Sequence, residues 1–504
     1  MFSNMMQAII DRIHAQPEQV ALVNRQGRVD FRTLGARTQA IADEIKQRQP
    51  NRVLIYGHKE LDTFASMLAC TLCGISFTVV DAANPTSRLV QVAAMHEADL
   101  LILGAESYLD QTLSSEAYFI AAHQPSVAFR FQLWQRGDNP IFYVLSTSGS
   151  TGVPKGVMIG YEGFGHFYQW YRESLTLNHS GGAHVNHACL AFDMGILDSF
   201  PSLAVGKAVV MLPHEYNALP RQNIRLMTQE ADVEVSSWFS TPSFLEMMCL
   251  DPKFNAQSLP GMRVFFVGGE FVPHQLIAKI AARFPQAQVL HAYGPTETTC
   301  VTHACPVTAD DMRYSQRLSL GRPLGVNRIR IEDDDGQELP ASEIGEVVIY
   351  GGQVAHGYLP VSHPQNVAFG SRDGERFYRS GDFGYVDESG NLFLKGRKDG
   401  QIKWNGNRIE LVEIENVAAR SGRIRQSAVI PVYVQDKLTQ LVMYVQLEQD
   451  TSDERQAFDQ FMHQHLPRYM VPSSVHFVAA LPMNLHGKID RVKLQHQWHE
   501  QQAS

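Results

Sequence analysis

Two strand-like runs with a helix-like run between them limit this chain to a fold with a parallel sheet. Residues 263–267 predict a strand that stops at Gly268-Gly269, and Pro273 suits the first turn of a helix that follows. Residues 288–292 predict the next strand. The loops after both strands, at Gly268 and at Tyr293, then fall at the carboxyl edge of the sheet, where open α/β sheets bind ligands.

The first two-thirds of the chain repeats this alternation, for example in the strand-like runs at 52–56 and 76–80. The character changes at residues 397–400, after which helices and strands alternate in a short, compact region. A chain of 504 residues also exceeds the usual size of one domain. We therefore predict an α/β fold with a large N-terminal domain, residues 1–398, of mixed, mainly parallel sheets flanked by helices. A small C-terminal α+β domain follows, residues 399–504.

Charge and composition exclude several classes of function. The net charge is -9 and no run of five or six like charges occurs, so we expect no nucleic-acid partner. The most apolar stretch, residues 66–80, is interrupted by Gly74 and too polar to predict stable membrane insertion. Cys70 and Cys73 form a CxxC without a second ligand pair, which favours buried small side chains over a redox or zinc site. The other four cysteines are scattered, which fits a reducing, cytoplasmic setting.

The strongest chemical signal is the segment 146–156, Ser-Thr-Ser-Gly-Ser-Thr-Gly-Val-Pro-Lys-Gly. Glycines let the backbone curl so that several N–H groups point at one anion, while the hydroxyls add donors and Lys155 adds positive charge. Residues 157–159 predict a strand rather than the helix that follows a Walker A loop. A flexible surface turn is the alternative. The predicted phosphate contacts are Thr147, Ser148, Gly149, Ser150, Thr151, Gly152 and Lys155.

This segment resembles the signature of the adenylate-forming superfamily: acyl-CoA synthetases, luciferases and the adenylation domains of nonribosomal peptide synthetases. Five further motifs follow in the family's order, at residues 293–298 (YGPTET), 345–347 (GEV), 378–382 (YRSGD), 396–403 (GRKDGQIK) and 484–490 (NLHGKID). The resemblance implies an AMP-forming ligase with ATP and Mg²⁺ as cofactors.

The motifs also imply roles for single residues in nucleotide binding. Tyr293 offers a ring face to adenine, and Asp382 offers acceptors to the ribose hydroxyls. Glu297 is a hard oxygen ligand that suits Mg²⁺. The nucleotide contacts implied in addition to the phosphate loop are Gly269, Glu270, Ala292, Tyr293, Gly294, Thr296, Asp382, Arg397 and Lys488.

Lys488 matches the family's catalytic lysine, which bridges the substrate carboxylate and the α-phosphate. A positioned cation there strengthens its grip as the two anions react. With Glu297 and Thr147 it makes up the predicted catalytic set; a solvated surface lysine is the alternative. Asp399 matches the family's hinge, about which the small domain rotates between the two half-reactions.

Asp193 matches the carboxylate that amino-acid-activating members use to hold the α-ammonium group. A buried carboxylate needs a cationic partner, and an amino acid supplies one. The alternative role for Asp193 is a helix N-cap. The predicted substrate residues are Asp193, Met194, Leu197, Gly268, Cys300 and Val301.

The whole chain is most similar to stand-alone D-alanine–carrier-protein ligases of teichoic acid alanylation, and to a glycine-activating relative of lipid A modification. D-alanine ligases carry a cysteine at the position of Gly268. Its missing side chain, with Met194 and Leu197 opposite, favours glycine over D-alanine, while L-alanine and serine stay open because one methyl group discriminates weakly.

No carrier domain follows Lys488, so the expected acceptor is the phosphopantetheine of a separate carrier protein or free coenzyme A. Activation of an amino acid favours the carrier protein, for cell-envelope (lipid A) modification. The alternatives are a D-alanine ligase of the teichoic acid type, an acyl-CoA ligase, which Asp193 argues against, and a nucleotide-binding regulatory protein without catalysis.

Overall fold

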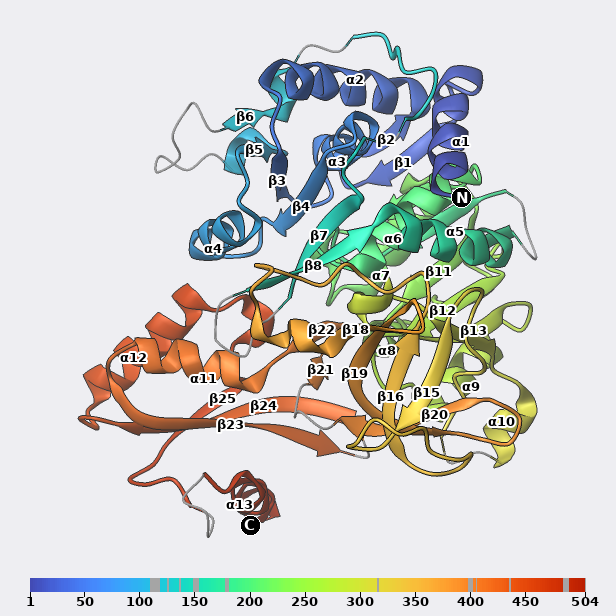
Figure 1. Cartoon of the computed structure of the whole chain (residues 1–504). Helices are drawn as coiled ribbons and strands as arrows, with labels where there is room; N and C mark the ends of the chain where they lie inside the picture. Colours follow the sequence, from blue (N-terminus) through green and yellow to red (C-terminus); the bar gives the residue numbers. More distant parts are fainter. Residues whose placement is uncertain are drawn as a thin grey trace. The chain divides into compact units, whose positions relative to one another are not determined.

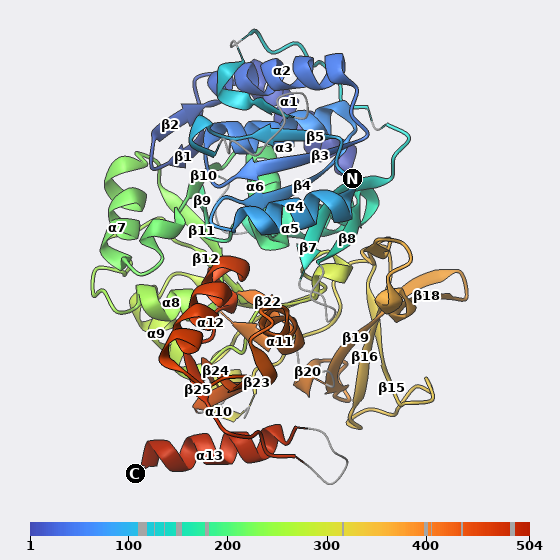
Figure 2. The same cartoon turned by 90° about the vertical axis from the view of Figure 1, so that its left-hand side faces the viewer.

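The computed structural model describes residues 1–108, 118–124, 127–135, 137–147, 154–176, 181–314, 317–397, 402–404, 406–434, 437–483 and 489–503 (Figures 1 and 2). The chain divides into two compact units. The first contains residues 1–82, 93–146 and 156–398, and the second contains residues 83–92, 147–155 and 399–504.

An eight-stranded sheet in the first unit carries the strands predicted around Gly268. Its order is β14-β13-β12-β11-β9-β10-β1-β2, and the pairs from β13 to β1 are parallel. Figure 1 shows β11, β12 and β13 side by side. The bounds are β1 Val20–Asn24, β2 Gly27–Asp30, β9 Ala183–Asn186, β10 Ala208–Met211, β11 Val235–Ser240, β12 Val264–Gly268, β13 Gln288–Tyr293 and β14 His303–Pro306.

A seven-stranded sheet is built from the other early strands, in the order β17-β8-β7-β4-β3-β5-β6. β4, β3, β5 and β6 are parallel neighbours, as the alternation of the sequence predicts. The bounds are β3 Arg52–Gly57, β4 Ser76–Asp81, β5 Leu100–Leu103, β6 Tyr118–Ile120, β7 Ile141–Thr147, β8 Lys155–Gly160 and β17 Tyr358–Leu359.

Strand β12 shows why the central strands are apolar on both faces. Side chains alternate across a strand, so Val264 and Phe266 pack into one core cluster while Phe265 and Val267 pack into another. The first cluster contains side chains of both sheets and of several helices, so it joins the two sheets. The second contains the apolar face of α9 (His274–Arg283), the helix predicted after Pro273.

The helices of the first unit run between strands, with α4 extending from the second unit into the first. Their bounds are α1 Phe2–Ala15, α2 Phe31–Arg48, α3 Leu61–Cys73, α4 Thr86–His96, α5 Tyr161–Thr176, α6 Asp193–Ala204, α7 Pro220–Arg225, α8 Pro242–Met248, α9 His274–Arg283 and α10 Ala309–Tyr314. Short helical turns are η1 Glu106–Tyr108, η2 Ala121–His123, η3 His214–Tyr216, η4 Leu226–Glu230, η5 Thr296–Thr298 and η6 Pro364–Ala368.

A third sheet in the first unit is mainly antiparallel and holds the YRSGD segment. It contains β15 Arg328–Glu332, β16 Gly345–Tyr350, β18 Phe369–Arg372, β19 Glu375–Val386 and β20 Leu392–Arg397. β19 and β20 form a hairpin, whose turn is held by the Asp387 carboxylate accepting hydrogen bonds from the main-chain N–H groups of Ser389 and Asn391.

The second unit contains a three-stranded sheet with helices on both faces. β23 (Ile424–Val434), β24 (Lys437–Leu447) and β25 (Ser474–Phe477) pack against α11 (Leu411–Arg420) and α12 (Ser452–His465) on one face and against α13 (Arg491–Ala503) on the other (Figure 2). β21 (Ile402–Trp404), β22 (Asn407–Ile409) and the turn η7 (Arg468–Met470) complete it.

The predicted fold class is confirmed: large mixed, mainly parallel sheets are followed by a small α+β region. Among the described residues, every helix is too short or too polar to cross a membrane.

Candidate active site

The ends of β12 and β13 form the floor of the candidate site. The two strands are parallel neighbours, with Gly268 paired to Ala292, so the loops after them leave the sheet at the same edge. A Cβ on Gly268 would lie 2.3 Å from the carbonyl oxygen of Ala292, so only glycine fits the spacing of the strands there. Gly269 has a φ of +86°, which glycine adopts without strain and which turns the chain away from the sheet.

A buried carboxylate lies beside Tyr293, at the end of β13. The Tyr293 hydroxyl donates to Asp382 Oδ2 at 2.5 Å, and the Arg397 guanidinium donates to Asp382 Oδ1 at 2.6 Å. Asp382 on β19 and Arg397 on β20 are directly opposite each other in the hairpin. Burial, with Asp382 next in effect, raises the pKa of Tyr293 well above its usual value, so the hydroxyl stays protonated.

Asp382 is held by its backbone as well. Its N–H donates to Ser380 Oγ at 3.0 Å, and that hydroxyl donates to the carbonyl of Val347 at 2.6 Å. Both carboxylate oxygens still have lone pairs for further donors, because each oxygen accepts more than one hydrogen bond. The Tyr293–Asp382–Arg397 group therefore offers acceptors in a fixed place, which suits a diol such as ribose.

Glu297 is fully buried in the turn η5, which follows the Tyr293 loop. The Tyr358 hydroxyl donates to Glu297 Oε1 at 2.5 Å and lies 3.2 Å from the Tyr378 hydroxyl. Buried carboxylates need such hydrogen-bond donors or a cation. A fixed, hard oxygen ligand of this kind fits Mg²⁺, which binds through one or two carboxylates together with substrate phosphates.

The residues after Glu297 have an unusual backbone. Thr299 and Cys300 have φ of 58° and 66°, a region that costs non-glycine residues energy. Gln353 holds this turn: its main-chain oxygen accepts from Thr299 Oγ1 at 2.8 Å, and its side chain donates to the carbonyl of Val301 at 2.9 Å. The strained turn fixes Cys300 and Val301, both predicted substrate residues, in a buried position.

Asp193 is the first residue of α6 and is partly buried. The N-cap position belongs to Phe192, so Asp193 is not the N-cap that the sequence left as an alternative. A carboxylate in the first turn is favoured by the helix dipole. Its Oδ1 accepts from the N–H of Met194 at 2.8 Å, and the side chains of Met194 and Leu197 are buried in the core behind it.

Tyr143 on β7, which motif analysis did not identify, is close enough to Asp193 and Cys300 for their charges to act on its hydroxyl. Its side chain is fully buried, and burial raises its pKa well above the usual value, with smaller contributions from Asp193 and Cys300. Its hydroxyl has no hydrogen-bond partner within the described parts of the chain. A buried polar group without a partner loses free energy, so a ligand that binds here gains by meeting it.

Two further predicted residues have structural surroundings that bear on substrate size and on nucleotide binding. A Cβ on Gly269 would lie 3.5 Å from Met194 Cε and 3.7 Å from Thr241 Cγ2, so these methyl groups face the Gly269 backbone. Glu270 accepts hydrogen bonds from the N–H and hydroxyl of Ser243 at 3.1 and 2.5 Å, near the start of α8. Glu270 thus helps to anchor α8 as well as standing in the predicted nucleotide loop.

In the second unit the structure describes only the ends of the predicted phosphate loop. Thr147 ends β7, and its Oγ1 is buried without a hydrogen-bond partner in the described part of the chain. Lys155 begins β8, is buried, and donates to Glu410 Oε1 at 3.2 Å. The remaining loop residues Ser148 to Gly152, the predicted hinge Asp399 and the predicted catalytic Lys488 lie outside the described residues.

Several residues of the site belong to no recognised sequence motif and could not be predicted from one. Tyr358 lies on a strand of two residues, 61 positions from the Glu297 that it contacts. Gln353 is 54 positions from Thr299 in the turn that it holds. Tyr378 differs from these residues because it is the first residue of the YRSGD motif, from which it could have been predicted.

Comparison with known proteins places these residues in a family. Residues 10–359 match the family described as AMP-binding enzyme, and residues 413–488 match the AMP-binding enzyme C-terminal domain. Curated relatives include D-alanine–D-alanyl carrier protein ligases of Bacillus mycoides and Bacillus anthracis. Each is 32% identical, and each alignment covers 95% of this chain and 96% of the relative.

Solved structures with the same fold include a Vibrio cholerae adenylation domain, AlmE, in complex with glycyl-adenosine-5'-phosphate. It has a TM-score of 0.85 and 22% identity, covering 99% of this chain and 98% of that one. The amide bond synthetase McbA of Marinactinospora thermotolerans has a TM-score of 0.84 and 22% identity, covering 98% and 99%. At these identities the likeness establishes the fold alone.

Proposed function

Because the chain belongs to the AMP-binding enzyme family, whose members form adenylates, we propose that it activates a small amino acid as aminoacyl-AMP and transfers it to a carrier protein. The acceptor is the phosphopantetheine thiol of a separate protein. D-alanine is the first candidate substrate, because the curated relatives that match nearly the whole chain are named for it.

The observation that carries this proposal is the place of Asp193 at the start of α6, within electrostatic range of the buried Tyr143 hydroxyl. An ammonium group there would add a cation beside the carboxylate and meet the Tyr143 hydroxyl, which has no hydrogen-bond partner among the described residues; an uncharged acyl chain supplies neither contact. Discrimination by buried polar groups is strong, so this arrangement favours amino acids over fatty acids.

The nucleotide half of the proposal rests on the residues around Tyr293. Asp382 would accept hydrogen bonds from the ribose hydroxyls and the Tyr293 ring would lie against adenine. Mg²⁺, held by Glu297, would supply charge neutralisation for the triphosphate when bound. We assign Lys488 the catalytic role that the resemblance implies. Thr147 and the other predicted residues of the segment 147–155 would bind the phosphates, and Asp399 would be the hinge.

The reaction takes place in two steps. A carboxylate oxygen of the amino acid attacks the α-phosphorus of ATP, and the bond to pyrophosphate breaks. The carrier's thiol then attacks the acyl carbon, AMP leaves with the electron pair of the broken C–O bond, and the thiol proton passes to solvent. Holding Asp382 and Asp193 on rigid elements orients both reactants before bond formation.

Glycine is the second candidate. A Cβ built on Gly269 would be in ordinary van der Waals contact with Met194 Cε and Thr241 Cγ2, so the case for glycine rests on the sequence argument from Met194 and Leu197. Gly268 supports glycine as the substrate less than the sequence suggests. A Cβ built at this position would point at the Ala292 carbonyl, so the spacing of the strands explains why the residue is glycine. The proposed role in the cell envelope depends on which amino acid is activated: modification of lipid A for glycine, or of teichoic acid for D-alanine.

Amino-acid-dependent exchange of ³²P-pyrophosphate into ATP tests the proposal. D-alanine, glycine, L-alanine, L-serine and a fatty acid are compared at matched concentrations, with holo-carrier protein omitted. The proposal predicts exchange with D-alanine or glycine and none with the fatty acid. Exchange with the fatty acid alone would overturn it and favour an acyl-CoA ligase.

A further inference from the structure

Four side chains of metal-ligand type meet in the first unit, apart from the residues assigned to ATP and the amino acid. His58 follows β3, Asp81 ends β4, Cys189 follows β9, and His214 begins η3 after β10. β3 and β4 belong to the seven-stranded sheet, while β9 and β10 belong to the eight-stranded sheet. The cluster therefore forms where loops at the carboxyl ends of both sheets converge.

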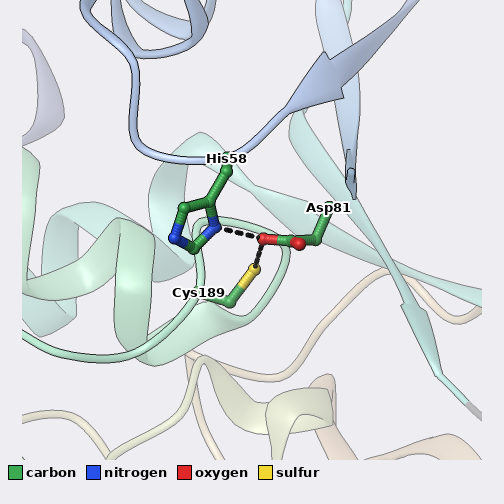
Figure 3. A group of neighbouring side chains, drawn as sticks. All are labelled: His58, Asp81 and Cys189. Atoms are coloured by element: carbon green, nitrogen blue, oxygen red, sulfur yellow. Dashed lines mark hydrogen bonds and ion pairs between the residues drawn. The ribbon is translucent and has the colours of Figure 1, made fainter. Parts of the chain in front are cut away.

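The ligand atoms of His58, Asp81 and Cys189 are close enough to share one ion, while His214 is close to His58 and Glu215. His58 Nδ1 lies 2.6 Å and Cys189 Sγ 2.7 Å from the same atom, Asp81 Oδ2, and Figure 3 shows both side chains directed at this carboxylate. One ligand atom from each of the three residues lies within 4.8 Å of the other two. His214 Nδ1 lies 3.2 Å from His58 Nδ1, with the ring centroids 4.0 Å apart.

The loops that carry the cluster are fixed by Lys59. Its buried ammonium donates to the main-chain oxygens of Asn186, His187 and Leu212, at 3.0, 2.7 and 2.9 Å. These carbonyls lie at the ends of β9 and β10, next to Cys189 and His214. The ligand positions are thus set by the scaffold, as preorganised metal sites require.

We propose that His58, Asp81 and Cys189 bind a zinc-type transition-metal ion, with His214 as the fourth ligand. Imidazole, thiolate and carboxylate together suit Zn²⁺, and a carboxylate with a thiolate balances its charge. In a tetrahedral site with zinc–ligand bonds of about 2.0–2.3 Å, ligand atoms lie roughly 3.3–3.7 Å apart. The two contacts to Asp81 must therefore lengthen by about 1 Å as the ion enters.

The proton balance of binding is defined by the ligands. The Cys189 thiol loses its proton to solvent, and the His58 proton moves from Nδ1 to Nε2 so that Nδ1 binds the ion. The main-chain N–H of His214, which lies 3.2 Å from His58 Nε2, then loses that contact. His214 is partly exposed, which gives the ion a route from solvent.

A metal ion bound to this cluster would link the two sheets close to the residues assigned to the amino-acid substrate. The Cys189 carbonyl accepts from the N–H of Phe192 at 3.0 Å, and Phe192 directly precedes Asp193. The bound ion would therefore stabilise the start of α6 and raise the melting temperature. The alternative is a hydrogen-bonded His–Asp–Cys group that only holds the loops together.

Cobalt titration of the chelator-treated full chain tests the site, because a thiolate bound to Co²⁺ absorbs in the near ultraviolet. We expect one Co²⁺ per chain with this absorption, displaced by Zn²⁺, and a Zn²⁺-dependent rise of several degrees in melting temperature. Cys189→Ser should abolish the absorption, while the matched control Cys305→Ser should keep it. Cys305 is also partly buried, and its thiol donates to the carbonyl of Ser319.

Absorption that is missing in the wild type, or that persists in Cys189→Ser, would overturn the proposal. His214→Ala provides a second test that leaves the buried ligands in place, with circular dichroism as the check on folding. It should weaken Co²⁺ binding at least about tenfold, by analogy with removal of groups that support metal ligands. Unchanged Co²⁺ affinity in this variant would exclude His214 as a ligand.

Discussion

Asp382 and Glu297 are both buried carboxylates, and their partners separate their functions. Asp382 contacts a guanidinium and a phenol and is placed to accept more donors, whereas Glu297 is fixed by Tyr358. The first arrangement suits an uncharged polar ligand, and the second suits a cation. Each difference leads to its own experiment.

Replacing Asp382 by asparagine should raise the KM for ATP in pyrophosphate exchange. The amide keeps the shape but loses half of the acceptor capacity, and we expect a fall of about 10- to 100-fold in kcat/KM for ATP, from one or two lost hydrogen bonds. Asp373→Asn is the control, because Asp373 is exposed in a left-handed turn that asparagine tolerates. An unchanged KM for ATP in Asp382→Asn would refute the ribose assignment.

Tyr358→Phe removes the donor to Glu297 and leaves the packing intact. The carboxylate is then less well held, so a higher Mg²⁺ concentration should be needed for half-maximal exchange, by several-fold for a hydrogen bond of about 1–2 kcal/mol. Tyr350→Phe is a matched control, since the Tyr350 hydroxyl donates to another buried carboxylate, Glu332, at 2.9 Å. Equal Mg²⁺ dependence in the two variants would contradict a metal role for Glu297.

At the scale of elements, the β12–β13 pair sets the position of both binding loops. Gly268→Ala would place a Cβ against the Ala292 carbonyl, so the strands must separate, at a cost of about 1–3 kcal/mol. Urea unfolding should show a lower midpoint for this variant. Gly396→Ala is the control, because nothing lies within 4 Å of its Cβ position. Equal midpoints would show that Gly268 is free to carry a side chain.

The sequence predicts these elements well because their signals are local. The run before Gly268 and the helix after Pro273 follow from alternation and turn residues. Sheet order has no local signal. Nothing in the sequence shows that β1 lies beside β10, or that β17 brings Tyr358 to Glu297.

The lack of a local signal for sheet order also explains why the sequence does not predict the candidate metal cluster. His58, Asp81 and Cys189 are spread over 132 positions and match no zinc spacing, and Cys189 is one of the cysteines that the sequence leaves scattered. Only the convergence of two sheets brings them together. The left-handed pair Thr299–Cys300 also escapes prediction, because neither residue type favours positive φ.

At the scale of the whole molecule, buried histidines make stability depend on pH. Burial lowers the pKa of His96 and His291 to about 4 and that of His303 to about 3, against about 6.5 when unfolded. The unfolded chain therefore binds more protons below pH 6.5, so the free energy of unfolding falls as pH drops from about 6.5 toward 4.

Urea unfolding at pH 7.5 and pH 5 measures this effect, and the lower midpoint should be at pH 5. His303→Gln removes one titrating ring, so the difference between the two midpoints should shrink. If His303→Gln keeps the full difference, the titration of His303 does not contribute.

We infer that Asp193 recognises the ammonium group of the substrate. The most direct test compares pyrophosphate exchange with D-alanine and with propionate, which lacks only the amino group, in the wild type and in Asp193→Asn. For the wild type, kcat/KM should be far higher with D-alanine. In the asparagine variant, kcat/KM with D-alanine should fall by a factor on the order of 10²–10³, the loss expected when one partner of a buried ion pair is removed. The kcat/KM with propionate should change little. An Asp193→Asn enzyme that still prefers D-alanine as strongly as the wild type would contradict the account.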